Sequence, residues 1–155
     1  QQIGTVEEIW NRPANRFVAS FVGEPAMNLL PARLGDRTSV TLPEVDHEAV
    51  LSFEGELDPK AAGELSLGIR PQEIEVLRSA GVASTLPCSV RLLEFQGETT
   101  VLTLTMEGPA KQVVKVAVAA SEPYRVGERL WLKVRPQSIH LFAGDRPVLR
   151  RKLRT

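Results

Sequence analysis

The chain has 155 residues, of which 43% are hydrophobic, 25% charged and 5% aromatic, so it can bury a core without disulfides or a metal ion. Nineteen Lys and Arg residues balance nineteen Asp and Glu residues, which excludes the net positive charge that drives non-specific nucleic-acid binding. The single Cys88 cannot form an intramolecular disulfide, and no apolar run reaches the roughly 20 residues of a membrane-spanning helix. The composition predicts one globular domain, or a domain plus a fragment, in a reducing cytoplasm. The start at Gln1 favours a fragment.

Charge is distributed unevenly along the chain. Between Glu44 and Glu75 there are nine acidic and two basic residues, and from Lys111 to the end eleven basic and three acidic residues. We interpret these stretches as solvated faces of strands and loops that partly neutralise each other, with a docking surface as the alternative. The basic tail at residues 150–155 is expected to fray.

Two short helices are predicted before residue 25. Thr5 and Glu8 have the spacing of a capping box at the start of a helix over residues 6–11. Pro13 fits the first turn of a second helix, which Gly23 ends. These helices are expected to form an interdomain apolar face of Trp10, Phe17, Val18 and Phe21.

After Pro25 the pattern changes to short alternating runs separated by Gly, Pro and Asp, which is typical of an all-β barrel or sandwich. Strands are predicted at residues 28–34, 38–42, 48–54, 64–70, 74–77, 86–95, 99–106, 111–119, 129–135 and 139–142. The fold class is therefore expected to be mainly β.

An internal repeat predicts how these strands are organised. Residues 63–77 read GELSLGIRPQEIEVL and residues 127–142 read GERLWLKVRPQSIHLF, with one residue inserted in the second copy. In each copy a strand ends at Arg, Pro removes a ladder donor and fixes φ, a turn follows, and a second strand resumes at Ile. Two pseudo-symmetric halves packed as a small closed or nearly closed barrel would pair the backbone N–H and C=O groups at the strand edges. Arg70 and Arg135 are expected at its rim.

Motifs for catalysis or metal binding are absent from the sequence. There is no GxxxxGK[ST] phosphate loop, no Cys or His lies at a metal-ligand spacing from His47 or His140, and no Ser has a nucleophile-elbow context. The acidic run from Glu54 to Asp58 is interpreted as a solvated loop before Pro59. The sequence thus predicts no catalytic, cofactor-binding or metal-binding residue.

Several segments resemble one protein family. Residues 1–34, QQIGTVEEIWNRPANRFVASFVGEPAMNLLPARL, resemble the stretch after the switch histidine in ATP-binding subunits of bacterial carbohydrate ABC importers, typified by the maltose and glycerol-3-phosphate systems. LGIRPQEI resembles the family's Leu-Gly-Ile-Arg-Pro-Glu-His-Ile segment, with Gln72 and Glu73 replacing Glu and His. LLEFQGETTVLTL resembles its Leu-Gly-x-Glu-Thr-x-Val hairpin. The resemblance spans nearly the whole chain and is weakest over residues 37–63.

This resemblance implies a domain organisation. Residues 1–24 would be the helical remnant of a nucleotide-binding domain, residues 25–149 an OB-like, transport-associated (TOBE-type) regulatory domain, and residues 150–155 the basic tail. The parent protein would be an ABC-type ATPase that uses ATP and Mg to drive solute import. Its phosphate loop, signature sequence, Walker B acid and switch histidine would all lie upstream of Gln1, so the fragment alone is expected to be no enzyme.

The resemblance also implies partners and contact sites. The partners are a second copy in a homodimer, the nucleotide-binding domain, the permease subunits and, in some members, a regulatory protein, with no nucleic acid among them. The parent would be cytoplasmic and peripheral to the inner membrane through the transporter complex. Arg70, Glu98 and Arg135 are the candidate regulatory or interface residues, and Arg70 is expected to pair with Glu73 or Glu98.

Two other functions remain open at this stage. Similar small barrels in molybdate systems bind oxyanions between subunits, and OB folds bind nucleic acids. The sequence shows no convergent cluster of Ser and Arg for the first function, and no surface of interleaved aromatic and basic residues for the second.

Overall fold

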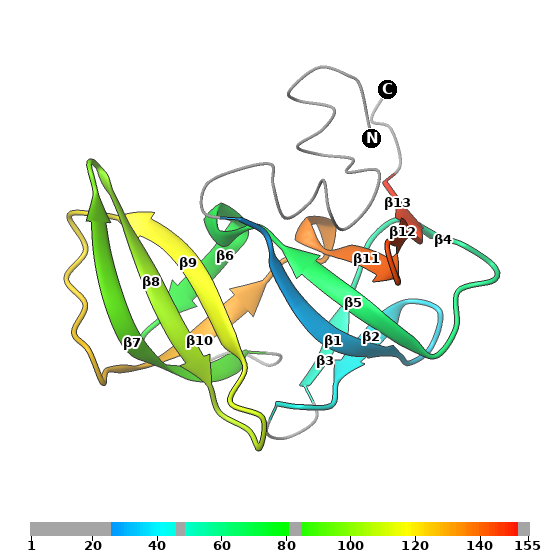
Figure 1. The fold of residues 1–155 in the computed structure, drawn as a ribbon, viewed down its shortest axis with the longest axis horizontal. Helices are drawn as coiled ribbons and strands as arrows, with labels where there is room; N and C mark the ends of the chain where they lie inside the picture. The colour runs from blue at the N-terminus through cyan, green and yellow to red at the C-terminus, as the bar shows by residue number, and fades with distance from the viewer. Residues whose placement is uncertain (1–25, 46–48, 81–84, 152–155) are drawn as a thin grey trace.

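The computed structural model describes residues 26–45, 49–80 and 85–151, and the regular structure there is antiparallel β-strand apart from two short 3-10 turns (Figure 1). The predicted helices, with Trp10, Phe17, Val18 and Phe21, lie outside these residues, as does His47. The elements are β1 (Asn28–Leu34), β2 (Ser39–Leu42), β3 (Ala49–Ser52), β4 (Glu56–Leu57), β5 (Glu64–Ile69), η1 (Pro71–Glu73), β6 (Ile74–Leu77), β7 (Leu86–Gln96), β8 (Thr99–Met106), β9 (Val113–Ala119), β10 (Arg129–Val134), η2 (Pro136–Ser138), β11 (His140–Ala143), β12 (Arg146–Pro147) and β13 (Leu149–Arg150).

The strands form two large sheets that lie side by side in Figure 1. One sheet has the order β12-β11-β5-β1-β2-β3, and the other has the order β6-β10-β7-β8-β9. A short third sheet pairs β13 with β4. A mainly β fold is therefore confirmed. Among the described residues there is no helix long and apolar enough to cross a membrane.

The two large sheets are built by the same plan, which extends the internal repeat to most of the chain. Each half begins with three sequential antiparallel strands, β1-β2-β3 or β7-β8-β9, and a fourth strand, β5 or β10, pairs with the first of them. After a 3-10 turn, the last strand of each half crosses to the other sheet, so that β6 pairs with β10 and β11 pairs with β5. The halves therefore exchange their final strands.

The pairing register shows that this exchange follows the repeat. Leu67 lies opposite Leu141 in one sheet, and the repeat-equivalent residues Leu132 and Val76 lie opposite each other in the other sheet. The equivalence also reaches the first strands, because Leu30 opposes Leu67 while Leu86 opposes Leu132. A proline follows both Leu30 and Leu86, a short match that the sequence analysis did not use. The predicted pseudo-symmetry is thus present in the strand pairing.

One hydrophobic core fills the space between the halves. Its fully buried members come from both sheets, including Leu67 and Leu141 from one and Leu102 and Leu132 from the other. Hydrogen-bonded pairing does not continue from β9 to β6 within the described ranges, so the second sheet stays open there. Strand β9 instead packs against η1. This contact places the first Arg-Pro turn under the edge of the opposite half.

Candidate functional site

The two Arg-Pro turns have the same backbone structure. Arg70 and Arg135 each precede a 3-10 turn in an extended conformation, with φ −75° and ψ 138° for Arg70 and φ −80° and ψ 139° for Arg135. The Glu73 N–H donates to the Arg70 carbonyl, and the Ser138 N–H donates to the Arg135 carbonyl, both at 2.9 Å. The proline at the first position of each turn suits both its fixed φ and its missing donor. The repeat therefore encodes two equivalent crossovers.

The side chains of these turns have different environments. Arg70 is 1% exposed, whereas Arg135 is on the surface. Pro71 is buried beside β9, while the carbonyl of Pro136 accepts a hydrogen bond from the Glu54 N–H at 3.2 Å. The prediction that both arginines lie at an outer rim is wrong for Arg70, because η1 is covered by β9.

Arg70 carries its charge inside the protein. Burial lowers the pKa of Arg70 to about 10, the carboxylate of Glu73 opposes this shift, and the positive charge of Arg151 adds to it. Of the two predicted partners, Glu73 is thus the carboxylate whose charge acts on the guanidinium. Glu98 lies on the surface at the turn between β7 and β8, where its carbonyl accepts from the Ala120 N–H at 2.8 Å.

His140 lies next to this charge, at the start of β11. It is 8% exposed and opposes Gly68 across the sheet, where glycine leaves room for Met27 and Phe142. Arg151 donates from Nη2 to Nε2 of His140 at 3.2 Å. Burial, together with the charges of Arg151 and then Arg70, lowers the pKa of His140 to about 3. The imidazole is therefore neutral near pH 7 and accepts the arginine N–H at Nε2.

A pocket of about 540 Å³ opens beside His140 and is lined by β11, by the C-terminal segment that contains β12 and β13, and by β4. Its basic lining residues are His140, Arg146, Arg150 and Arg151, its acidic ones are Glu56 and Asp58, and the rest of the wall is mostly apolar. No pattern in the sequence predicts this pocket, and the acidic run at residues 54–58 is expected to be a solvated loop. Residues 150 and 151 were expected to fray, yet Arg150 belongs to β13 and Arg151 contacts His140.

Asp58 holds the outer wall of the pocket together through an ion pair and a backbone hydrogen bond. Its carboxylate pairs with Arg146, and its backbone N–H donates to the Val148 carbonyl at 2.8 Å. The pKa of Asp58 is lowered, first by the Lys60 backbone N–H and then by the hydrogen bond from Arg146. Gly55 allows β13 to approach, since a Cβ at this position, with φ +130°, would lie 2.8 Å from the Arg150 carbonyl oxygen.

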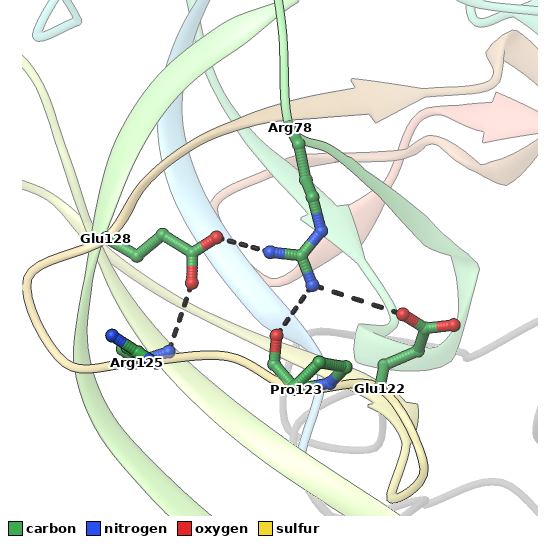
Figure 2. Close-up of polar contacts among 5 residues, drawn as sticks. All are labelled: Arg78, Glu122, Pro123, Arg125 and Glu128. Carbon is green, nitrogen blue, oxygen red and sulfur yellow. Dashed lines mark hydrogen bonds and ion pairs between the residues drawn. The ribbon is translucent and has the colours of Figure 1, made fainter.

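An arginine makes equivalent contacts in the other half, the one that contains β7 to β10. Figure 2 shows Arg78, which follows β6, pairing with Glu128 and donating to the Pro123 carbonyl at 2.6 Å, with Glu122 4.0 Å away. Its guanidinium also lies 4.4 Å from the ring centre of Tyr124. In each half, then, an arginine that follows the exchanged strand binds a loop of the half whose sheet that strand joins. Arg78 follows β6 and binds the loop between β9 and β10, and Arg146 follows β11 and binds the loop that contains Asp58.

Asn28 links the two sheets beside η1. Its side-chain amide donates to the Lys115 carbonyl at 2.8 Å and to the Ile69 carbonyl at 3.2 Å, and its Oδ1 accepts from the Lys115 N–H at 2.7 Å. The amide thereby satisfies backbone groups on the outer edge of β9, which would otherwise be open to strand addition. No sequence pattern predicts this role for Asn28, which belongs only to the segment over residues 1–34 that resembles the importer family.

The described ranges contain no group of three or more His, Cys, Asp or Glu residues placed to hold a metal ion. Cys88 is buried, and burial raises its pKa to about 12, so its thiol is not an activated nucleophile. The structure places Arg135 and Glu98 on the surface and a pocket beside His140.

The protein is similar to known proteins in sequence and in fold. Residues 67–142 match the TOBE domain family. The sn-glycerol-3-phosphate import ATP-binding proteins UgpC of Shigella sonnei and Escherichia coli are 37% and 36% identical to the chain over 145 residues, which are 94% of the chain and 39% of each relative. The chain therefore spans well under half the length of these relatives.

A solved structure of the cytoplasmic molybdate-binding protein ModG shares the fold with a TM-score of 0.55 and 13% identity, over 74% of this chain and 94% of ModG. At this identity the likeness concerns the fold alone. The sequence matches show a TOBE domain at residues 67–142 and identify the chain as homologous to the C-terminal region of UgpC-type ATP-binding subunits of ABC importers.

Proposed function

We propose that the chain is the C-terminal regulatory and dimerisation region of an ATP-binding subunit that powers import of a sugar or a related solute such as glycerol 3-phosphate. The observation that carries this proposal is the identity of 36–37% through 94% of the chain with UgpC proteins, of which it covers 39%. In this arrangement residues 1–24 complete the nucleotide-binding domain, residues 25–149 form an OB-like regulatory domain, and residues 150–155 follow as a basic tail.

ATP and Mg would be bound by the rest of the parent protein. The chain carries no phosphate loop, so its contribution is contact with other proteins rather than catalysis. The partners proposed are a second copy of the parent, its own nucleotide-binding domain and the permease subunits, with a regulatory protein in addition. The parent would work in the cytoplasm, held at the inner membrane by the permease subunits.

The three candidate contact residues divide by their exposure. Glu98 and Arg135 are on the surface and free to meet a partner, whereas Arg70 is buried and acts by bracing η1 under β9. We assign the direct contacts to Glu98 and Arg135. A partner that regulates transport must bind two states of the complex with different affinity. Substitution of Glu98 or Arg135 should therefore alter regulation without altering folding.

A chimera tests this proposal. The region of Escherichia coli UgpC that aligns with this chain is replaced by the chain, and glycerol 3-phosphate uptake is measured in cells without their own UgpC. Restored uptake is the expected result. A chimera expressed at the native level that neither copurifies with the permease nor supports uptake contradicts the proposal. The chain alone should neither bind nor hydrolyse ATP, and micromolar ATP binding with turnover would contradict that part.

An oxyanion-binding module is the second candidate, because the fold resembles that of the molybdate-binding protein ModG. Titration calorimetry of the chain with molybdate distinguishes this candidate from the regulatory role in an importer, since saturable binding would support the oxyanion function. A mobility-shift assay with single-stranded DNA tests the remaining alternative, a nucleic-acid-binding OB fold. We expect no shift, because the formal net charge of the chain is zero.

A further inference from the structure

Strands β7, β8 and β9, at the left end of the molecule in Figure 1, have one face on the core and the other toward solvent. The outward side chains include Leu92 and Val113, which are 48% and 42% exposed. The equivalent face of β1, β2 and β3 carries Arg33 and Thr41, and Val50 is its one large exposed hydrophobic residue within the described chain. The outward face of the second half, which we call the β8 face, is the more apolar of the two. It consists of Leu92, Glu94, Val101, Thr103, Thr105, Val113, Lys115 and Ala117.

Two charged side chains lie on opposite sides of this face. Glu94 is opposite Val101 in the β7–β8 ladder, and Lys115 is opposite Thr103 in the β8–β9 ladder, so that β8 separates them. Neither Glu94 nor Lys115 forms an ion pair with any residue that the structure describes. With a negative charge on one side of β8 and a positive charge on the other, the β8 face is complementary in charge to a second copy of itself.

A two-fold axis along β8 brings these charges together. When two β8 faces meet around such an axis, β8 lies on β8, and β7 of each copy lies over β9 of the other. Glu94 of one copy then lies over Ala117 of the second copy, one outward position, or about 7 Å, from Lys115 of that copy. The flexible lysine side chain can span this distance, and its aliphatic stem lies over Leu92. The symmetry makes each contact twice.

The size of the β8 face determines how strong this contact can be. Three strands about 4.8 Å apart, over about six residues each, cover roughly 300 Å². A standard stable interface buries roughly 800 Å² on each partner. The β8 face by itself therefore supports a weak dimer, with a Kd on the order of 100 μM. In the parent protein, contacts between the other domains would raise the effective concentration of the two faces.

We propose that the β8 face is the surface through which this domain meets a second copy of the chain, with Glu94 of each copy paired to Lys115 of the other. The inference rests on the proposed role in dimerisation and assigns that role to one face of the fold. Glu98 and Arg135 do not belong to the β8 face, so they stay available to other partners.

Sedimentation equilibrium of the 155-residue chain in low-salt buffer, at concentrations up to about 1 mM, measures the Kd of the dimer. Glu94→Lys and Lys115→Glu should each raise this Kd about tenfold, because like charges then meet twice across the interface. The double variant that carries both reversals should have a Kd within about threefold of the unmodified chain. Arg33→Glu reverses a charge on the equivalent face of the first half, and this matched control should leave the Kd unchanged.

Salt provides a second measurement, which needs no variant. The Kd of the unmodified chain should rise with ionic strength, because two partly exposed ion pairs are screened. A dimer that becomes tighter with salt overturns the pairing of Glu94 with Lys115.

A chain that stays monomeric at the highest concentration overturns the proposal. Single variants with an unchanged Kd, or a double variant as weak as the single ones, overturn the choice of this face even if the chain dimerises. Melting curves establish that each variant is folded, and the salt dependence decides where one is not. The proposed transport role is judged separately, because the UgpC chimera can support uptake whichever face the two copies use.

Discussion

The two Arg-Pro-Gln turns share sequence and backbone, yet one arginine is buried and the other is exposed. The difference arises in the strands that lie beside them. The seven-residue strand β9 packs over η1, whereas β3 has four residues and the chain beyond it touches η2 through the Glu54–Pro136 hydrogen bond. A duplicated motif thus conserves the path of the backbone, while the neighbouring strand decides what its side chain does.

Removing each arginine tests this comparison most strongly. Arg70→Ala should lower the free energy of unfolding by about 3 kcal/mol, because it leaves the Glu73 charge uncompensated and a space in the interior. Arg135→Ala should change it by about 0.5 kcal/mol or less. Urea denaturation of both variants measures the difference. Similar losses at the two positions would show that burial does not separate the turns.

The next comparison concerns the position after each turn where the repeat places His140 in one copy and Glu75 in the other. His140 has a folded-state pKa of about 3, below its ordinary value of 6.5, so between these values the unfolded chain takes up a proton that the folded chain does not. The contribution of neutral His140 to the free energy of unfolding is complete above pH 6.5 and declines as the pH falls. From pH 7 to pH 5 the loss should be about 2 kcal/mol.

Denaturation curves at several pH values check this dependence. For His140→Gln, the free energy of unfolding at each pH is compared with that of the same variant at pH 7. In this comparison the decline between pH 7 and pH 5 should disappear. Glu75→Gln, at the exposed equivalent position, should retain the decline of the unmodified chain. A His140→Gln variant with an unchanged pH profile would contradict a buried neutral histidine.

A third pair is Gly68 and its equivalent, Lys133. A Cβ at Gly68 would lie 2.5 Å from the Met27 sulfur and 3.2 Å from Phe142 Cε2, so Met27 would have to move. Gly68→Ala should destabilise the protein by about 1 to 2 kcal/mol. Lys133→Ala, in the more open sheet, should cost about 0.5 kcal/mol or less. Thermal melting suffices, and a stabilised Gly68→Ala would exclude the close packing.

The smallest expected difference separates the two arginines that fasten the exchanged strands. Arg78→Ala and Arg146→Ala should each reduce stability by about 1 kcal/mol or less, because both side chains are about half exposed. Arg78 should have the larger effect, since it also binds the Pro123 carbonyl and the Tyr124 ring. Denaturation at low and high salt distinguishes the ion-pair part, which salt should weaken. A larger loss for Arg146→Ala would reverse the ranking.

Much of the fold was predictable because its long strands alternate clearly. The predicted bounds 28–34, 74–77 and 99–106 are those of β1, β6 and β8. Strands β4, β12 and β13 were missed, because two residues are too few to show a period. The exchange of β6 and β11 was missed as well, since alternation identifies a strand but not its neighbour.

The site was less predictable than the fold. The repeat drew attention to Arg70, but the burial of its side chain depends on β9, which begins 43 residues later in the chain. The pocket joins β4 to β13, two short strands whose paired residues Leu57 and Leu149 lie 92 positions apart in the sequence, so no local pattern could indicate it. The electrostatic effect of Glu73 on Arg70 was within reach because the two residues lie at one short turn.

The exchanged strands also determine how movement can pass through the molecule. The chain crosses between the sheets at η1 and η2, and at each crossing a proline has a fixed φ. With the Asn28 hydrogen bonds to Lys115, the two crossings connect the sheets at three places, so we expect the sheets to resist twisting against each other. A displacement of either half is therefore expected to move both sheets together.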